Sequence, residues 1–283
     1  MQKKILVLND LHVGSSYGLL PPSFMDGQGN VHEQNIGQKY LWGRFAATLS
    51  KLQPQKIDAI VVNGDLIDGL QFKSKGAPLT LHRIEDQREA AVKVLEEVRN
   101  TFPKAGWFFV EGTPYHEVGE QVAQVAFNLL NKAQDVRRTL TLRIGKAIVR
   151  FHHETSFTGG YTKSGSLEKE IVATWLSEAM QDWEKVHCEV RAHCHYFCYV
   201  GRKDRLAIVA PGWQLQTDYT TKNSPHKSIP DIGCLVLTVD DSLLEFGSCP
   251  VAFSEYLYRH PGPSIVDISE EVQDGAALSA VAL

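Results

Sequence analysis

Residues 57–68 read IDAIVVNGDLID, and this stretch decides the fold class. Its apolar part, Ala59 to Val62, ends abruptly at Asn63-Gly64-Asp65. Apolar residues that run on without alternation are typical of a strand buried on both faces, as in a parallel sheet covered by helices. The polar residues that follow such a strand mark its carboxyl end, which is where open α/β sheets bind ligands.

Three more segments repeat this pattern of an apolar run stopped by polar residues: 5–8, 107–110 and 147–151. Helical spacing of apolar residues characterises three other segments: 83–100, 117–132 and 167–186. Strands and helices in alternation predict an α/β protein in which helices cover a mainly parallel sheet.

Two regions of the chain differ from this pattern. The C-terminal third contains expected strands at 206–210, 233–239 and 243–246, and the short polar turns between them predict a second, more antiparallel sheet. Residues 14–38 are rich in Gly, Ser, Pro, Asn and Gln and predict a long loop. Residues 1–260 are expected to form one domain, and residues 261–283 a C-terminal extension or partly disordered tail.

Composition excludes some classes of protein. The chain has 29 Lys and Arg against 33 Asp and Glu, a net charge of −4, which argues against coating nucleic acid or a membrane by bulk charge. Its five cysteines form no C-x-x-C pair, which favours a reducing compartment. No stretch approaches the ~18 apolar residues of a membrane span, and the run at 5–8 is too short for a signal core. We expect a cytoplasmic protein without a membrane partner.

Residues that bind metals follow the expected strands. They occur as Asp10-Leu11-His12, Gly64-Asp65-Leu66-Ile67-Asp68, His116-Glu117, His152-His153 and His193-Cys194-His195. Two ligands one residue apart on an extended segment point the same way, so each such pair can share a metal. Carboxylates and imidazoles together suit Mn, Fe, Zn or Ni better than Ca or Mg. The sequence therefore predicts a transition-metal site at the sheet edge.

This set of motifs resembles the calcineurin-like metallophosphoesterase superfamily. The family pattern is D-x-H, G-D-x-x-D, G-N-H-D/E, a lone His and G-H-x-H, each after a strand. All five occur here in that order over about residues 5–215, with an altered third motif at residues 112–117. The resemblance implies a four-layer α/β/β/α sandwich with mixed sheets.

The resemblance also implies a ligand set for two divalent metal ions, with Mn favoured among Mn, Fe, Zn and Ni. Asp10, His12 and His195 would hold the first metal. Asp65 would bridge both, and His193 and His152 would complete the second. His152 is preferred to His153 because the first histidine after the strand is the usual ligand in the family.

The third motif departs from the family pattern. It reads Gly112-Thr113-Pro114-Tyr115-His116-Glu117, so no Asn follows the glycine and two extra residues precede the histidine. Either the loop is extended and His116 and Glu117 still form the catalytic pair, or His116 replaces the missing Asn as a ligand. We favour the first interpretation.

The implied activity is hydrolysis of a phosphodiester, of nucleotide or nucleic-acid type, by a metal-bridged hydroxide, with a phosphoester as the partner. His116 would donate a proton to the leaving oxygen, Glu117 would orient His116, and Asp68 would support the site. Two alternatives remain: a phosphomonoesterase, and a degenerate member of the fold that binds metal or partners without catalysis.

Overall fold

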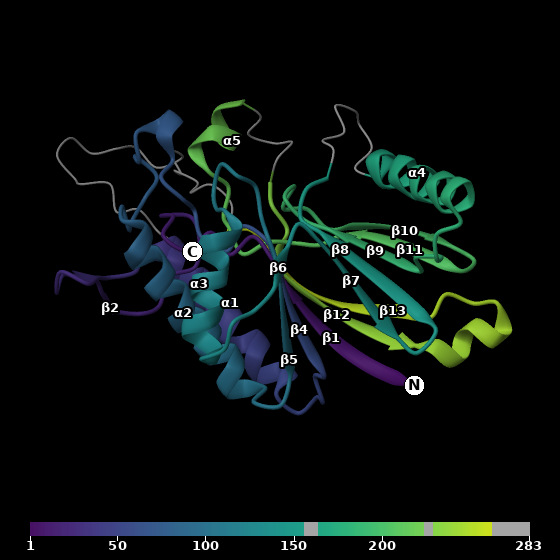
Figure 1. Cartoon of the computed structure of the whole chain (residues 1–283). Coiled ribbons are helices and arrows are strands. Elements are labelled where there is room, and N and C mark those ends of the chain that lie inside the picture. Colours follow the sequence, from purple (N-terminus) through teal and green to yellow (C-terminus); the bar gives the residue numbers. More distant parts are fainter. Residues whose placement is uncertain (156–163, 224–228, 262–283) are drawn as a thin grey trace, which may run out of the picture.

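The computed structural model describes residues 1–155, 164–223 and 229–261 and contains two mixed β-sheets packed face to face (Figure 1). The first sheet has the strand order β13-β12-β1-β4-β5-β6. Its strands are β1 (Gln2–Leu8), β4 (Ala59–Asn63), β5 (Gly106–Val110), β6 (Val136–Arg137), β12 (Ile232–Asp240) and β13 (Val251–Tyr258). From β1 to β6 the strands run parallel, whereas β12 and β13 are each antiparallel to their neighbours.

The second sheet has the strand order β10-β11-β9-β8-β7. Its strands are β7 (Thr139–Ile144), β8 (Ala147–His152), β9 (Cys188–Arg191), β10 (Cys198–Arg202) and β11 (Arg205–Val209). The central strands β8, β9 and β11 are parallel, and an antiparallel strand lies at each edge.

Helices cover the outer faces of both sheets, as Figure 1 shows. Against the first sheet pack α1 (Ile36–Leu52), α2 (Ile84–Thr101) and α3 (Gly119–Leu130), and against the second packs α4 (Gly165–Gln181). The result is four layers, α/β/β/α, with mixed sheets. This confirms the fold class predicted from the sequence.

Strand β1 shows why its apolar residues do not alternate with polar ones. Leu6 and Leu8 are buried in the core between the first sheet and the helices. Ile5 and Val7 are buried in the second core, between the two sheets. A strand in the middle of four layers must be apolar on both faces, which is the pattern read from the sequence.

Two expectations about the C-terminal third are wrong. Residues 243–246 belong to a 3-10 helix, η2 (Asp241–Phe246), because the Asp240 carboxylate accepts the Ser242 N–H and starts a turn. The strand expected at 233–239 exists as β12 but joins the first sheet beside β1. The centre of the second sheet is parallel because α4 makes the crossover from β8 to β9.

The predicted long loop at 14–38 contains some regular structure. β2 (Phe24–Met25) and β3 (Val31–His32) pair as a small hairpin, and α1 already begins at Ile36. Two further short elements are η1 (Phe72–Ser74), a 3-10 helix, and α5 (Asp218–Asn223). The expected C-terminal extension lies outside the described residues from position 262 onward.

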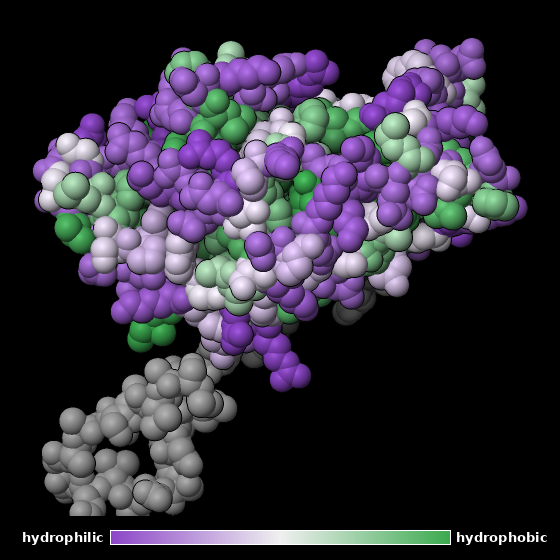
Figure 2. Space-filling model, turned by 90° about the horizontal axis from the view of Figure 1, so that it is seen from below, coloured by the Kyte–Doolittle hydropathy of each residue, from purple (hydrophilic) through white to green (hydrophobic). Residues whose placement is uncertain are grey.

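The molecular surface is mixed in character. The face shown in Figure 2 is mainly hydrophilic, with apolar side chains scattered between polar ones. Within the described part of the chain, each helix is too short or too polar to span a bilayer. All five cysteines are free thiols.

Candidate metal centre

The carboxyl ends of strands from both sheets bring the polar motifs together. Because β1, β4 and β5 pair in parallel, the segments that follow them leave the first sheet at one edge. β8 and β9 are likewise parallel neighbours in the second sheet. Across the sheets, Nε2 of His153 lies 3.0 Å from Oδ2 of Asp65, and Nε2 of His195 lies 3.1 Å from Oδ1 of Asp10.

Asp10 has one carboxylate oxygen held by hydrogen bonds and one turned toward imidazoles. Its Oδ2 accepts from Asn9 Nδ2 at 2.8 Å and from the backbone N–H of His193 at 3.3 Å. Its Oδ1 lies 3.1 Å from Nε2 of His195 and 4.0 Å from Nε2 of His12. This buried Oδ1 has no hydrogen-bond partner among the described residues. Burial alone would raise the pKa of Asp10, but the nearby imidazoles, His195 foremost, lower it to about 2.

Asp65 repeats this arrangement. Its Oδ1 accepts from the backbone N–H of Thr113 at 2.7 Å and from the Thr113 hydroxyl at 2.9 Å. Its Oδ2 lies 3.0 Å from Nε2 of His153 and 3.9 Å from Nε2 of His12. Burial would raise the pKa of Asp65, but His153 and its neighbours hold it well below the usual range. Each of the two carboxylates therefore presents one oxygen to the imidazoles.

Hydrogen bonds decide which nitrogen of two imidazoles faces these carboxylates. Nδ1 of His153 lies 2.8 Å from the backbone carbonyl of Asn63, and Nδ1 of His12 lies 2.8 Å from Oδ1 of Asp68. A carbonyl and a carboxylate can only accept, so Nδ1 carries the hydrogen in both rings. Nε2 of each neutral ring therefore presents a lone pair to the centre, as in metal-binding histidines.

The backbone is strained at the residues that form the cluster. Five of them have φ in the left-handed region, which is uncommon for residues other than glycine. They are Asp10 (51°), His12 (43°), Asp65 (47°), His193 (67°) and His195 (51°). Gly64 precedes Asp65 with φ 83°, and a Cβ there would lie 2.4 Å from the His153 ring. Strain of this kind concentrates at functional sites.

His153, and not His152, is the histidine that lies beside Asp65 in the structure. Ala147, Val149 and Phe151 of β8 face the core between the sheets, so by alternation His153 points inward with them and His152 points away. Nδ1 of His152 lies 3.0 Å from the Thr139 hydroxyl. His153 is 1% exposed and takes the place at Asp65 that the sequence analysis gave to His152.

Three groups of side chains have ligand atoms that lie within 4.8 Å of one another: Asp10, His12 and His195; Asp65, His153 and His193; and His12, Asp68 and His116. In the third group, the Nδ1 side of His12 already pairs with Oδ1 of Asp68. The third group therefore orients His12 for the first group and is not counted as a separate metal site. Asp10 Oδ1 and His153 Nε2 are buried without hydrogen-bond partners among the described residues. A divalent cation in each of the first two groups would satisfy both atoms, so the residues fit metal ions.

The structure thus combines a four-layer arrangement with a cluster of side chains that come from the sequence motifs. The chain has the four-layer α/β/β/α arrangement with mixed sheets that the resemblance to the calcineurin-like metallophosphoesterases implies. Three solved structures overlap with it: Vacuolar Protein Sorting 29 from Cryptosporidium parvum, a predicted phosphoesterase from Streptococcus pneumoniae and an archaeal phosphodiesterase. They are 13%, 11% and 9% identical, with TM-scores of 0.45, 0.36 and 0.42.

These overlaps cover 91%, 85% and 90% of this chain and 99%, 85% and 99% of the others. Similarity at this level carries no argument about activity. No family model and no curated protein matches the sequence.

His116 and Glu117 occupy different surroundings. Nδ1 of His116 lies 3.0 Å from the backbone carbonyl of Asp68, and its ring packs edge-on against His12 with centroids 4.6 Å apart. Glu117 turns to the backbone instead: it accepts N–H groups from Leu66 at 2.9 Å and from Gly112 at 2.9 Å. Burial and the neighbouring Asp65 raise the pKa of Glu117 to about 8. Through these contacts Glu117 connects two loops of the candidate site, one that carries Leu66 and one that carries Gly112.

Thr113 is a site residue that the sequence analysis did not single out. It follows Gly112, where the family pattern has Asn, and both its N–H and its hydroxyl bind Asp65. The sequence feature that points to Thr113 is its position directly after Gly112 in the altered third motif. Thr113 thus fixes the carboxylate at the centre of the cluster.

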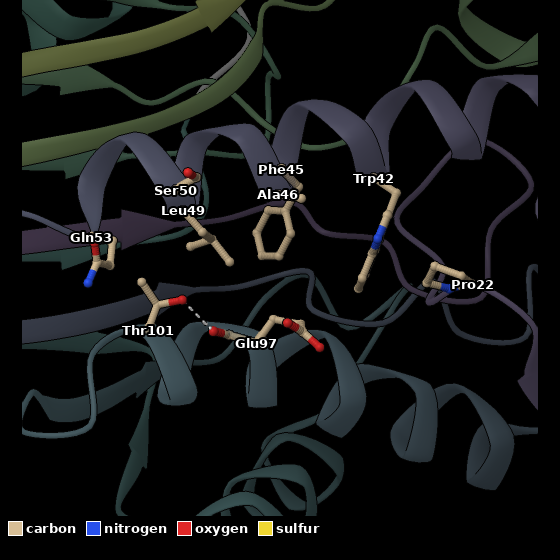
Figure 3. A pocket seen from close by; sticks show the side chains of 9 residues that line it. All are labelled: Pro22, Trp42, Phe45, Ala46, Leu49, Ser50, Gln53, Glu97 and Thr101. Atoms are coloured by element: carbon tan, nitrogen blue, oxygen red, sulfur yellow. Dashed lines mark hydrogen bonds between the residues drawn. The ribbon is translucent and has the colours of Figure 1, made fainter.

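The hollow drawn in Figure 3 lies away from this chemistry. It opens between α1 and α2, with Trp42, Phe45 and Leu49 on one side and Glu97 and Thr101 on the other. None of the clustered carboxylates and histidines lines it. The chemistry of the residues, rather than the size of a hollow, identifies the candidate site.

Metal binding is expected to release at least one proton at pH 7. Burial would lower the pKa of His153, but Asp65 and Asp10 together raise it to about 10 in the metal-free protein. Nε2 must lose this proton before it binds a metal, so below pH 10 affinity should rise with pH, by about tenfold per unit for one proton.

Calorimetric titration of Mn²⁺ in two buffers of different ionisation enthalpy measures this proton release. A number of released protons near zero per bound metal at pH 7 would contradict the expectation. The control is His153→Gln, whose side chain carries no titratable proton and should therefore release about one proton fewer per metal-binding event.

Proposed function

We propose that the chain is a metal-dependent phosphoesterase that hydrolyses a phosphodiester of nucleotide or nucleic-acid type. The observation that carries the proposal is the pair of buried carboxylates, Asp10 and Asp65. Each has one oxygen tied by hydrogen bonds and the other turned toward imidazoles. Burying such groups is costly without a compensating partner, and clusters of this kind mark functional sites.

Two divalent metal ions would occupy the cluster, with Mn favoured among Mn, Fe, Zn and Ni. Asp10, His12 and His195 would hold one, and Asp65, His153 and His193 the other. Oδ2 of Asp65 lies near both His153 and His12 and could serve both metals. Metals in such sites polarise phosphoryl oxygens and lower the pKa of bound water.

His116 would act as the general acid. Its Nδ1 donates to the Asp68 carbonyl, which orients the ring and leaves Nε2 for the oxygen of the leaving group. A positioned general acid contributes about 10²–10⁴-fold to the rate. Glu117 would act as a positioning residue, since its carboxyl oxygens accept N–H groups from the loops that carry Asp65 and Gly112.

The test is hydrolysis of bis-p-nitrophenyl phosphate and p-nitrophenyl phosphate with Mn²⁺, Ni²⁺, Zn²⁺ or EDTA. Turnover that EDTA abolishes, that Mn²⁺ restores and that is faster on the diester is the expected result. Faster turnover of the monoester would indicate a phosphomonoesterase. No turnover with any metal, from protein that binds metal stoichiometrically, would overturn the proposal.

The alternative is a binding module without catalysis. Thr113 in place of the family's Asn favours it, because a hydroxyl that already binds Asp65 is a poorer metal ligand than an amide oxygen. Three further predictions accompany the phosphoesterase proposal: a single domain over residues 1–260, a phosphoester partner and a cytoplasmic location.

A further inference from the structure

A short loop beside the candidate acid is anchored at its base and exposed at its tip. At the base, Gly69 gives its N–H to Oε1 of Gln87 and accepts from Nε2 of Gln87, both at 2.9 Å. A Cβ at Gly69 would lie 2.3 Å from the carbonyl oxygen of His116, so the loop passes directly against that residue. At the tip, η1 presents Phe72, which is 74% exposed.

The same loop contacts the candidate acid through side chains. Nε2 of Gln71 lies 3.3 Å from Nδ1 of His116 and donates to the Asp68 carbonyl at 3.1 Å. The hydroxyl of Tyr115 donates to Oε1 of Gln71 at 3.2 Å, and the Tyr115 ring packs edge-on against His116. Gln71 therefore joins the exposed loop to the residue nearest the chemistry.

Backbone strain also marks this loop. Gln71 and Lys75, which flank η1, have φ of 51° and 53°. Left-handed residues other than glycine carry a conformational cost and persist where the surroundings impose them, often at ligand clamps. The surrounding structure thus holds the backbone on both sides of η1, which carries Phe72, in a conformation that these residues would not adopt by preference.

The charge of the loop is opposite to that of the chain. Between Asp68 and Glu85 the sequence contains Lys73, Lys75 and Arg83 and no acidic residue, although the net charge of the chain is −4. Among the described residues, neither loop lysine forms an ion pair, and Nζ of Lys73 lies 5.6 Å from the centre of the Tyr115 ring. Lysines interleaved with exposed aromatic rings are the combination that binds nucleic-acid strands.

We infer that residues 70–75 and Tyr115 form a substrate platform that binds a nucleobase next to the scissile phosphodiester. Phe72 offers an exposed face on which a base stacks. Tyr115, whose ring lies below the Lys73 ammonium and against His116, connects this face to the candidate acid, and Lys73 and Lys75 attract the adjoining phosphates. The substrate class is then a single-stranded nucleic acid or other nucleotidyl diester, in preference to a diester without a base. This inference rests on the proposed function.

The test compares two diesters with the same leaving group: the p-nitrophenyl ester of thymidine 5′-monophosphate and methyl p-nitrophenyl phosphate. Phe72→Ala should lower kcat/KM for the thymidine ester about tenfold, the scale of one lost base–aromatic stack, and leave the methyl ester unchanged. Phe246→Ala is the matched control, because Phe246 is 77% exposed on η2, at the opposite end of β12 from the metal cluster. An unchanged ratio of the two esters in Phe72→Ala would overturn the inference.

Binding separates this inference from the proposed function. Fluorescence anisotropy with a labelled oligothymidylate measures affinity without catalysis. The plot of log affinity against log salt should lose about 0.7 of its slope for each of Lys73→Gln and Lys75→Gln. If no ester is hydrolysed but Phe72→Ala weakens this binding, the platform stands and the proposed function fails. If the methyl ester is hydrolysed and the wild type binds no oligothymidylate, the platform fails and the enzyme stands.

Discussion

Replacing Asp65 by asparagine is expected to lower metal-dependent hydrolysis by more than about 10³-fold. This exceeds the roughly 10–100-fold loss that follows when a residue that only hydrogen-bonds to a metal ligand is removed. The amide can keep the hydrogen bonds that Thr113 gives to Oδ1, so the loop should hold its shape. It replaces Oδ2, which faces His153 and His12, with an NH₂ group that cannot bind a cation. The change thus removes one of two carboxylate oxygens that lie near both metal groups, the other being Oδ1 of Asp10, which is 3.1 Å from His195 and 3.8 Å from His153.

Asp68→Asn is the matched control for this change. Asp68 is also buried, but its Oδ1 supports His12 through Nδ1 at 2.8 Å. We expect a smaller loss there, about 10–100-fold in activity or metal affinity. The measurements are kcat/KM on bis-p-nitrophenyl phosphate, metal content by mass spectrometry and folding by circular dichroism. Equal losses in the two variants, or full activity in Asp65→Asn, would contradict the shared role of Asp65.

The main elements could be predicted because their signals are local. The unbroken apolar runs of β1 and β4 follow from burial on two faces, and the residues behind them share an edge because the strands are parallel. The sequence alone therefore predicts that Asp10 and Asp65 lie near each other. Their separate roles in the candidate site remain proposals.

Helix α1 begins inside the segment predicted to be a loop, although the sequence contains its signal. Asn35 and Gln38 form a capping box, and Leu41, Phe45 and Leu49 repeat on the buried face. The Gly- and Gln-rich residues before them suggested a loop that continued to position 38. A capping motif is easily missed when the residues on both sides of it are typical of loops.

The role of Glu117 could not be predicted from the sequence. Its partners are backbone N–H groups of Leu66, Ile67 and Gly112, which come from two different loops. Backbone donors leave no trace in residue identity, so only tertiary structure shows that this carboxylate joins the loops. The expectation that Glu117 orients His116 therefore rested on adjacency in the chain.

The choice between His152 and His153 could have been made from strand periodicity. Ala147, Val149 and Phe151 lie on the face toward the core between the sheets, and Ile148 and Arg150 lie on the other face. Counting on by two reaches His153 and not His152. The family habit of using the first histidine was a weaker guide than the two-residue period of a strand.

Two alanine variants, one at each histidine, test whether His153 or His152 binds the metal. His153→Ala should reduce bound metal by about one ion per chain and hydrolysis by at least about 10²-fold, since it removes a nitrogen aimed at Asp65. His152→Ala should change activity by no more than about twofold, because its ring is directed at Thr139 rather than at the metal cluster. The two variants remove the same atoms one residue apart, so a general effect of truncation cannot explain a difference between them.

Folding has to be measured alongside these activities. His153 lies between two buried carboxylates, and removing one partner of a buried charged pair costs about 3–5 kcal/mol. His153→Gln, which keeps more of the side-chain volume and a polar end, guards against a variant that simply fails to fold. If folded His153→Gln retains two metals and full hydrolysis while His152→Ala loses them, the inward-facing histidine is not the ligand. Activity would then depend on a rearrangement of the end of β8 that reverses the alternation of its side chains.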